Sequence, residues 1–288
     1  MPPGEPSRLR RTIGAAAARL ARAGVEGARL DAELMLAEAA GVDRARLYAG
    51  IGELDSAARA RFAAMVALRA RRMPLAYILG RREFYSLEIK VAPGVLIPRP
   101  ETETLVALAL DQLAVRPAAR VLDLGCGSGA IALALAANAP QVRIVAADIA
   151  AGALESAAQN AARLGLAAQI EFVRGDCFTP LDGAGELGRF DLIVANPPYI
   201  ADAEIAALAP EVRDFEPRIA LAGGADGLDF YRRIAAGLNA HLAPAGAVIV
   251  EVGAGQAAAA AAIFHAAGRA AITIARDLAG IERVLLAR

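Results

Sequence analysis

Short apolar runs recur along the chain after residue 120, and each has the length of a buried β-strand. Stretches of helical periodicity separate the early runs, and this alternation is typical of a sheet with helices on both faces. We therefore expect an α/β fold built on a doubly wound, seven-stranded sheet. The strand candidates lie at residues 121–124, 142–147, 170–173, 190–195, 247–252, 271–274 and 282–286.

The first 80 residues contain no long strand-like run and show helical spacing instead. Apolar side chains at Ile13, Ala17 and Leu20 recur every three or four residues, as expected of one buried helix face. Asp55 or Ser56 can cap a second helix ahead of further apolar positions. We expect a small helical bundle here.

A linker follows the helical segment. Residues 84–97 have a hairpin-like pattern, in which Pro93 and Gly94 predict the turn. The expected organisation is a helical domain at 1–80, a β-hairpin linker at 81–98 and the sheet domain at 99–288.

A glycine-rich loop follows the first strand of the sheet domain. Glycines at 125, 127 and 129 permit positive φ and close approach of a ligand to the backbone, and the helix after them offers free N–H groups. Asp148 ends the next strand at a spacing suited to ribose hydroxyls. Loop and acid together predict an adenosine cofactor, and they fit a dinucleotide as well as other members of that class.

The third and fourth strands also end in polar motifs, Gly175-Asp176-Cys177-Phe178 and Asn196-Pro197-Pro198-Tyr199. Two prolines remove backbone donors, so the second motif is rich in acceptors. Asn196 adds a side-chain oxygen, and Tyr199 adds a flat face. Such a site suits a planar NH2 group, either a primary amide or the amine of a base.

Charge is distributed unevenly along a chain whose formal net charge is zero. Residues 1–82 carry 15 arginines, no lysine and 8 acidic residues, a net +7, which leaves −7 for the rest. The basic helices either present a solvated face or dock an acidic protein or nucleic acid. The start of the chain has no signal-like segment and no tract is apolar enough for a membrane span, so we expect a cytoplasmic protein. Two separated cysteines predict neither a disulfide framework nor a metal site.

The four strand-end motifs together resemble the class I S-adenosylmethionine-dependent methyltransferases. Further segments make the chain similar, over essentially its whole length, to the bacterial peptide-chain release factor glutamine methyltransferases of the HemK/PrmC family. These segments are 82–86, 96–103 and 216–228.

The resemblance implies a Rossmann-like methyltransferase sheet with an antiparallel last strand. It implies methyl transfer from S-adenosyl-L-methionine to the amide nitrogen, N(5), of the glutamine in the Gly-Gly-Gln motif of class-one release factors, with the helical domain docking that partner. The implied catalytic residues are Asn196, Pro197 and Tyr199, and these with Pro198 bind substrate. The implied cofactor residues are Gly125, Cys126, Gly127, Ser128 and Gly129 at the methionine moiety, Asp148 at the ribose, Asp176 and Cys177 at the adenine, and Asn196.

Several points stay open at this stage. Glutamine methylation of a ribosomal protein, or adenine-amine methylation of nucleic acid, would use the same motif, although the acidic sheet domain disfavours a nucleic-acid partner. A non-catalytic cofactor-binding module is a third alternative. Residues 99–103 either line the pocket or only pack, and oligomeric state is not predicted.

Overall fold

The computed structural model describes residues 5–49, 53–181 and 189–288. The chain divides into two compact units, one formed by Met1–Gly80 with Ala209–Phe215 and the other by Arg81–Leu208 with Glu216–Arg288. Residues 1–4, which the expectation about a signal segment involves, lie outside the described ranges.

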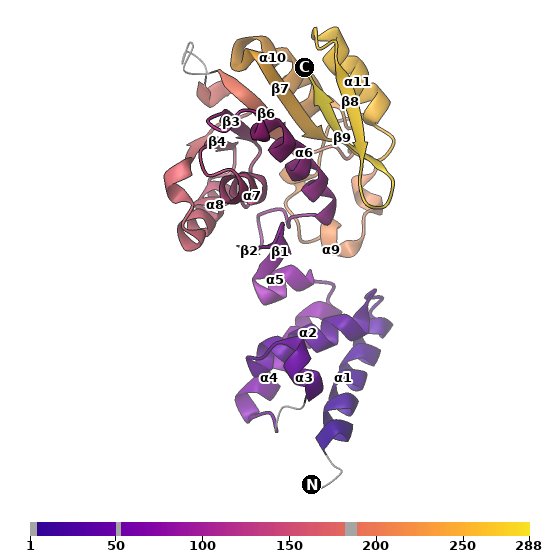
Figure 1. The fold of residues 1–288 in the computed structure, drawn as a ribbon. Helices are drawn as coiled ribbons and strands as arrows, with labels where there is room; N and C mark the ends of the chain where they lie inside the picture. The colour runs from indigo at the N-terminus through magenta and orange to yellow at the C-terminus, as the bar shows by residue number, and fades with distance from the viewer. Residues whose placement is uncertain (1–4, 50–52, 182–188) are drawn as a thin grey trace. The chain divides into compact units, whose positions relative to one another are not determined.

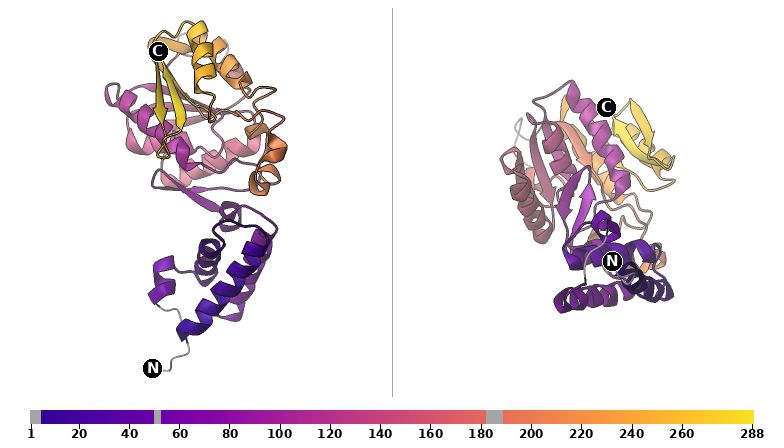
Figure 2. Two further views of the ribbon diagram at one scale, coloured as in Figure 1. Left: turned by 90° about the vertical axis from the view of Figure 1, so that its right-hand side faces the viewer. Right: turned by 60° about the horizontal axis from the view of Figure 1, so that its bottom comes forward.

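The first unit is helical, as Figure 2 shows. Its core is built from the predicted apolar faces, with Ile13, Leu20 and Phe62 buried together. Asp55 is confirmed as a helix cap, because its Oδ1 accepts the N–H of Ala58 at 2.6 Å. The helices are α1 (Glu5–Arg22), α2 (Ala28–Ala40), α3 (Arg44–Ala49), α4 (Ser56–Ala70) and α5 (Leu75–Leu79).

The first unit also contains a short segment from much later in the chain, with the single-turn helix α9 (Pro210–Arg213). Glu211 anchors it: its carboxylate accepts hydrogen bonds from Arg69 Nη1 at 2.9 Å and from Arg72 Nη2 at 2.6 Å. Arg69 also donates to Asp31 at 2.7 Å. Burial alone would raise the pKa of Glu211, but the hydrogen bonds, those from Arg72 foremost, lower it to about 2.

The linker forms an antiparallel hairpin of β1 (Arg81–Phe84) and β2 (Leu87–Lys90). Its turn is not at Pro93 and Gly94 as predicted, but at Tyr85 and Ser86, with φ of 49° and 62°. Two positive φ angles make the tight turn that matches strand twist, usually occupied by Asn-Gly, so Tyr-Ser gave no sequence signal. Pro93 and Gly94 form a separate turn closed by Val95 N–H to Ala92 O.

The second unit contains the expected seven-stranded sheet, with strand order β5-β4-β3-β6-β7-β9-β8 (Figure 1). The five strands from β3 to β7 run parallel to one another. The last strand, β9, is antiparallel to both of its neighbours, β7 and β8, and this arrangement confirms the α/β fold. The strands are β3 (Arg120–Leu124), β4 (Arg143–Asp148), β5 (Ile170–Arg174), β6 (Phe190–Ala195), β7 (Leu242–Glu251), β8 (Ile272–Arg276) and β9 (Glu282–Ala287).

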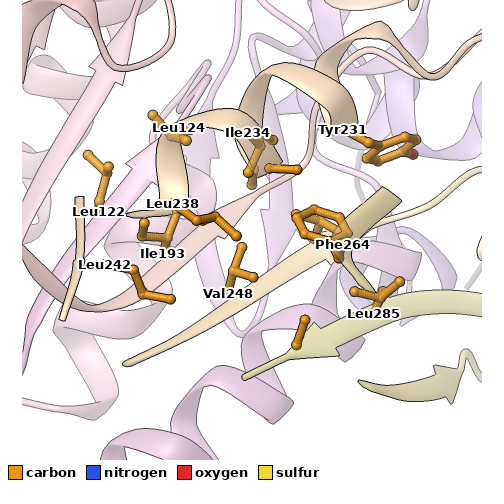
Figure 3. Packing of buried hydrophobic residues seen from close by; sticks show 14 of the residues in the cluster. Leu122, Leu124, Ile193, Tyr231, Ile234, Leu238, Leu242, Val248, Phe264 and Leu285 are labelled. Carbon is orange, nitrogen blue, oxygen red and sulfur yellow. The ribbon is translucent and has the colours of Figure 1, made fainter. Parts of the chain in front are cut away.

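Helices pack on both faces of this sheet. On one face, α10 (Asp229–His241) and α11 (Ala257–Ala266) contact each other and cover Leu122, Ile193 and Val248 (Figure 3). On the other lie α6 (Glu103–Ala114), α7 (Ala130–Asn138) and α8 (Ala151–Leu164), each in contact with the next. Burial on both faces explains why the strands read as continuous apolar runs in the sequence.

The ion pairs of Glu211 predict an acid-dependent contribution to stability. Because the pKa of Glu211 is lowered on folding, its contribution is present above about pH 4.5 and is lost as the pH falls toward 2, by about 3 kcal/mol in all. Urea unfolding of Glu211→Gln should therefore show a loss of stability at pH 7 that shrinks across this window. Asp214→Asn, an exposed acid of the same segment, is the control, and a pH-independent deficit in Glu211→Gln would contradict the prediction.

Candidate functional site

The carboxyl ends of the parallel strands form one edge where the predicted motifs meet. Leu124 pairs with Ala147 of β4 on one side and with Ala195 of β6 on the other, so the loops that follow are neighbours. A cavity of about 360 Å³ lies at this edge, within the range of small-molecule sites. Of the predicted site residues, its lining includes Gly125, Cys126, Gly127, Ser128, Asp148, Asp176, Cys177, Asn196, Pro197 and Pro198.

The glycine loop has the geometry that the sequence predicted. Gly125, Gly127 and Gly129 have φ of 71°, 56° and 82°. A Cβ added at either of the first two would meet no protein atom within 4 Å, so the space before the loop is open to a ligand. A Cβ at Gly129 would lie 3.0 Å from the Cβ of Ala157, so this glycine lets α7 and α8 pack closely.

Asp148 holds the loop in place as well as facing the cavity. Its Oδ2 accepts the N–H of Gly127 and its Oδ1 accepts the N–H of Ala150, both at 2.9 Å. Each carboxylate oxygen has a further lone pair, so both can still accept a ligand hydroxyl. The backbone of Ala150 thus fixes the orientation of the acid.

Asp176 and Cys177, which follow β5, line another side of the cavity. Asp176 Oδ1 accepts a hydrogen bond from Arg233 Nη2 at 2.6 Å, and the same guanidinium lies 5.0 Å from the ring centroid of Phe230. Cys177 has a positive φ of 54°, and burial raises the pKa of its thiol. The acid therefore faces the cavity with a cationic partner already bound.

Asn196 is tied to a buried hydrogen-bond network. Its Nδ2 donates to Thr102 Oγ1 at 3.0 Å, and Thr102 Oγ1 donates to Glu251 Oε2 at 2.5 Å. The Tyr199 hydroxyl donates to the other oxygen, Glu251 Oε1, at 3.3 Å. Within the described residues no hydrogen bond ends on Asn196 Oδ1 or on the main-chain oxygen of Pro197, which leaves two acceptors available at the cavity.

Tyr199 is not among the residues that line the cavity, and its backbone is held by a hydrogen bond and by close packing. Its main-chain oxygen accepts from Gln256 Nε2 at 2.8 Å. A Cβ at Gly227 would lie 2.4 Å from that oxygen, and one at Gly223 would lie 2.8 Å from the Tyr199 Cα. Two glycines of segment 216–228, Gly223 and Gly227, are thus required by close packing on the fourth motif. Stacking of Tyr199 on a substrate amide stays a prediction.

The end of the linker and the residues just after it supply part of the cavity wall. The carboxylate of Glu216 accepts hydrogen bonds from Arg99 Nη2 at 2.6 Å and from the N–H of Ile97 at 3.2 Å. Arg99 lines the cavity together with Pro98 and Thr102.

The side-chain amide of Asn160, in α8, contacts both the hairpin and the glycine loop. It accepts the N–H of Lys90 at 2.9 Å and donates to the main-chain oxygens of Lys90 and Ser128. This one amide therefore links the hairpin to the glycine loop.

Comparisons with known proteins agree with these motifs. The family models "PrmC N-terminal domain" and "Methyltransferase small domain" match residues 12–80 and 90–211. The release factor glutamine methyltransferase of Cereibacter sphaeroides is 46% identical over 277 residues, which cover 96% of each chain. That of Geobacter sulfurreducens is 46% identical over 267 residues, covering 92% of this chain and 91% of the relative. The chain belongs to the release factor glutamine methyltransferase family.

A solved structure gives the same fold at lower similarity. The hMettl16 catalytic domain in complex with MAT2A 3'UTR hairpin 6 matches with a TM-score of 0.59 and 20% identity, covering 77% of this chain and 81% of that one. The family resemblance and the Rossmann-like methyltransferase sheet predicted from the sequence are confirmed.

In this member of the release factor glutamine methyltransferase family, sequence reasoning missed Thr102, Glu251, Gln256, Arg233 and Asn160 as site residues. Glu251 carried a usable signal, since it ends β7 as Asp148 ends β4, and Val250 pairs with Ala195. Thr102 lay within the segment whose role was left open. The other three project from helices, or from the turn before one, and have no strand-end signal.

Two further properties concern the part of the chain that the structure describes. There, no group of three or more His, Cys, Asp or Glu side chains is arranged to hold a metal ion. Nor does any helix in those ranges combine the length and apolar character needed to cross a bilayer.

Proposed function

We propose that this protein transfers a methyl group from S-adenosyl-L-methionine to the side-chain amide nitrogen of the glutamine in the Gly-Gly-Gln motif of class-one release factors. The observation that carries the proposal is the pair of available acceptors, Asn196 Oδ1 and Pro197 O, beside the glycine loop. A primary amide has two N–H bonds to satisfy, which matches two acceptors.

The residues of the cavity fit the cofactor. The open space before Gly125 and Gly127 would take the methionine moiety, Asp148 would accept the ribose hydroxyls, and Asp176 with Cys177 would border the adenine. Bound S-adenosylmethionine supplies an electrophilic methyl group, so the protein has to orient a weak nucleophile rather than create a strong one. Asn196 and Pro197 O would hold both amide hydrogens and direct the nitrogen toward the methyl group.

The proposal is tested by radiolabel transfer from S-adenosylmethionine to a purified release factor, a ribosomal protein and DNA side by side. We expect label on the release factor, at the glutamine of the Gly-Gly-Gln motif, with little on the other two. Label on the ribosomal protein or on DNA alone would replace the proposed substrate.

Asn196→Ala should impair the reaction more than cofactor binding. If holding the amide contributes about 3 kcal/mol in the transition state, the single-turnover rate falls roughly 100-fold. Calorimetry should give a similar cofactor affinity. An unchanged rate at saturating cofactor and substrate would remove Asn196 from the mechanism.

We further propose that the basic helical unit docks the body of the release factor. Arg11, Arg19 and Arg22 of α1 are exposed and share one side of the helix. Contact at a second site raises affinity through effective concentration, and exposed charges steer association in a salt-dependent way.

Reversing these three arginines to Glu should raise the KM for intact release factor and reduce its salt dependence. A short Gly-Gly-Gln peptide, which has no body to dock, should be methylated equally by both proteins. Arg59→Glu, at an exposed arginine of α4, is the control for a single charge reversal on another helix of the unit. An unchanged KM for the intact factor in the triple variant would show that this face of α1 is not the docking surface.

A further inference from the structure

The buried carboxylate of Glu251 is the end point of the network that reaches Asn196. Its residue is 1% exposed, and Thr102 between them is 3% exposed. Within the described residues no ion pair involves Glu251, and the nearby Arg283 is paired with Asp277 at 3.2 Å. A buried carboxylate without an ion-pair partner is costly, and replacing such groups by apolar side chains often stabilises a protein. Its presence here points to a role other than stability.

The direction of the hydrogen bonds follows from counting protons. An ionised carboxylate only accepts, so the single hydroxyl proton of Thr102 must be donated to Glu251. The oxygen of Thr102 can then only accept, and the one group of the Asn196 side chain able to donate is its NH2. The amide oxygen of Asn196 is thereby turned away from Thr102. With the opposite amide orientation, two acceptors would face each other.

We propose that Glu251, acting through Thr102, is a positioning residue that holds the Asn196 amide with its oxygen available to the substrate. The inference rests on the proposed function for its kinetic consequences, although the orientation itself is a property of the free protein. Neither residue contacts the substrate amide in this account. They determine whether the oxygen or the NH2 group of the Asn196 side chain faces the substrate.

The groups around Glu251 make this arrangement sensitive to pH. Burial raises the pKa of its carboxyl to about 7, against the lowering effects of Thr102, Arg283 and Tyr199, while Glu101 adds to the rise. Tyr231, from α10, donates to the main-chain oxygen of Glu251 rather than to its carboxylate. A protonated carboxyl can itself donate to Thr102, and the hydrogen-bond direction is then no longer imposed. The proposal therefore requires turnover to fall as the pH drops through about 7.

The first test compares Thr102→Val, which keeps the shape and removes the hydroxyl, with Thr102→Ser, which keeps the hydroxyl. We expect the valine variant to lose roughly 30-fold in single-turnover rate with cofactor affinity unchanged, and the serine variant to recover most of that loss. A valine variant at the wild-type rate, or a serine variant as slow as valine, would overturn the inference.

A second readout does not depend on the substrate. The side-chain NH2 of Asn196, assigned by the signal that disappears in Asn196→Asp, should exchange slowly with solvent in the free wild-type protein and faster in Thr102→Val. Equal exchange in both would defeat the inference even if release factor proved not to be the substrate. Absence of label transfer by the wild type defeats only the proposed function.

The pH profile distinguishes positioning from simple packing. Wild-type single-turnover rates should fall on the acid side of about pH 7, whereas Glu251→Gln, which cannot ionise, should be slower and flat across this range. An acid limb retained unchanged in Glu251→Gln would assign the titration to another group and refute the role of Glu251.

Discussion

Parallel pairing of β3 with β6 is the constraint on which the rest of the site depends. These two strands are separated by 65 residues, yet Leu124 and Ala195 are direct partners, so the glycine loop and Asn196 leave the sheet side by side. The strand order reverses at this point, with β4 and β5 on one side and β7 on the other. Open α/β sheets bind ligands where such a reversal opens a crevice.

One partly buried glutamate and one fully buried glutamate show how differently the chain treats negative charge. Glu211 meets two guanidiniums, and its pKa is lowered to about 2. Among the described residues, the carboxylate of Glu251 accepts hydrogen bonds from two hydroxyls, those of Thr102 and Tyr199, and burial raises its pKa to about 7. The first arrangement fixes a segment of chain at every physiological pH. The second leaves a carboxyl able to change its protonation state beside the proposed reaction site.

Sequence alone located the strands and the motifs at their ends, because a buried strand and a glycine turn are encoded within a few neighbouring residues. The partners of those motifs depend on tertiary pairing. Thr102 and Glu251 were not linked to Asn196 because they lie 94 and 55 residues from it in the sequence. Tyr85 and Ser86 adopt a turn that their residue types disfavour, and Glu103 supports it by accepting the N–H of Tyr85. No local sequence pattern predicted that Ala209–Phe215 would be part of the helical unit.

The presence of Ala209–Phe215 in the helical unit has a consequence for how the two units can evolve. A domain appended at one end of an enzyme can be gained, lost or traded by a single fusion or deletion. Here the helical unit includes seven residues encoded inside the gene segment for the sheet unit, and Glu211 among them has its partners in Arg69 and Arg72. A recombination that replaced only residues 1–80 would have to supply new partners for Glu211 in place of Arg69 and Arg72. The two parts are therefore expected to have diverged together rather than as interchangeable modules.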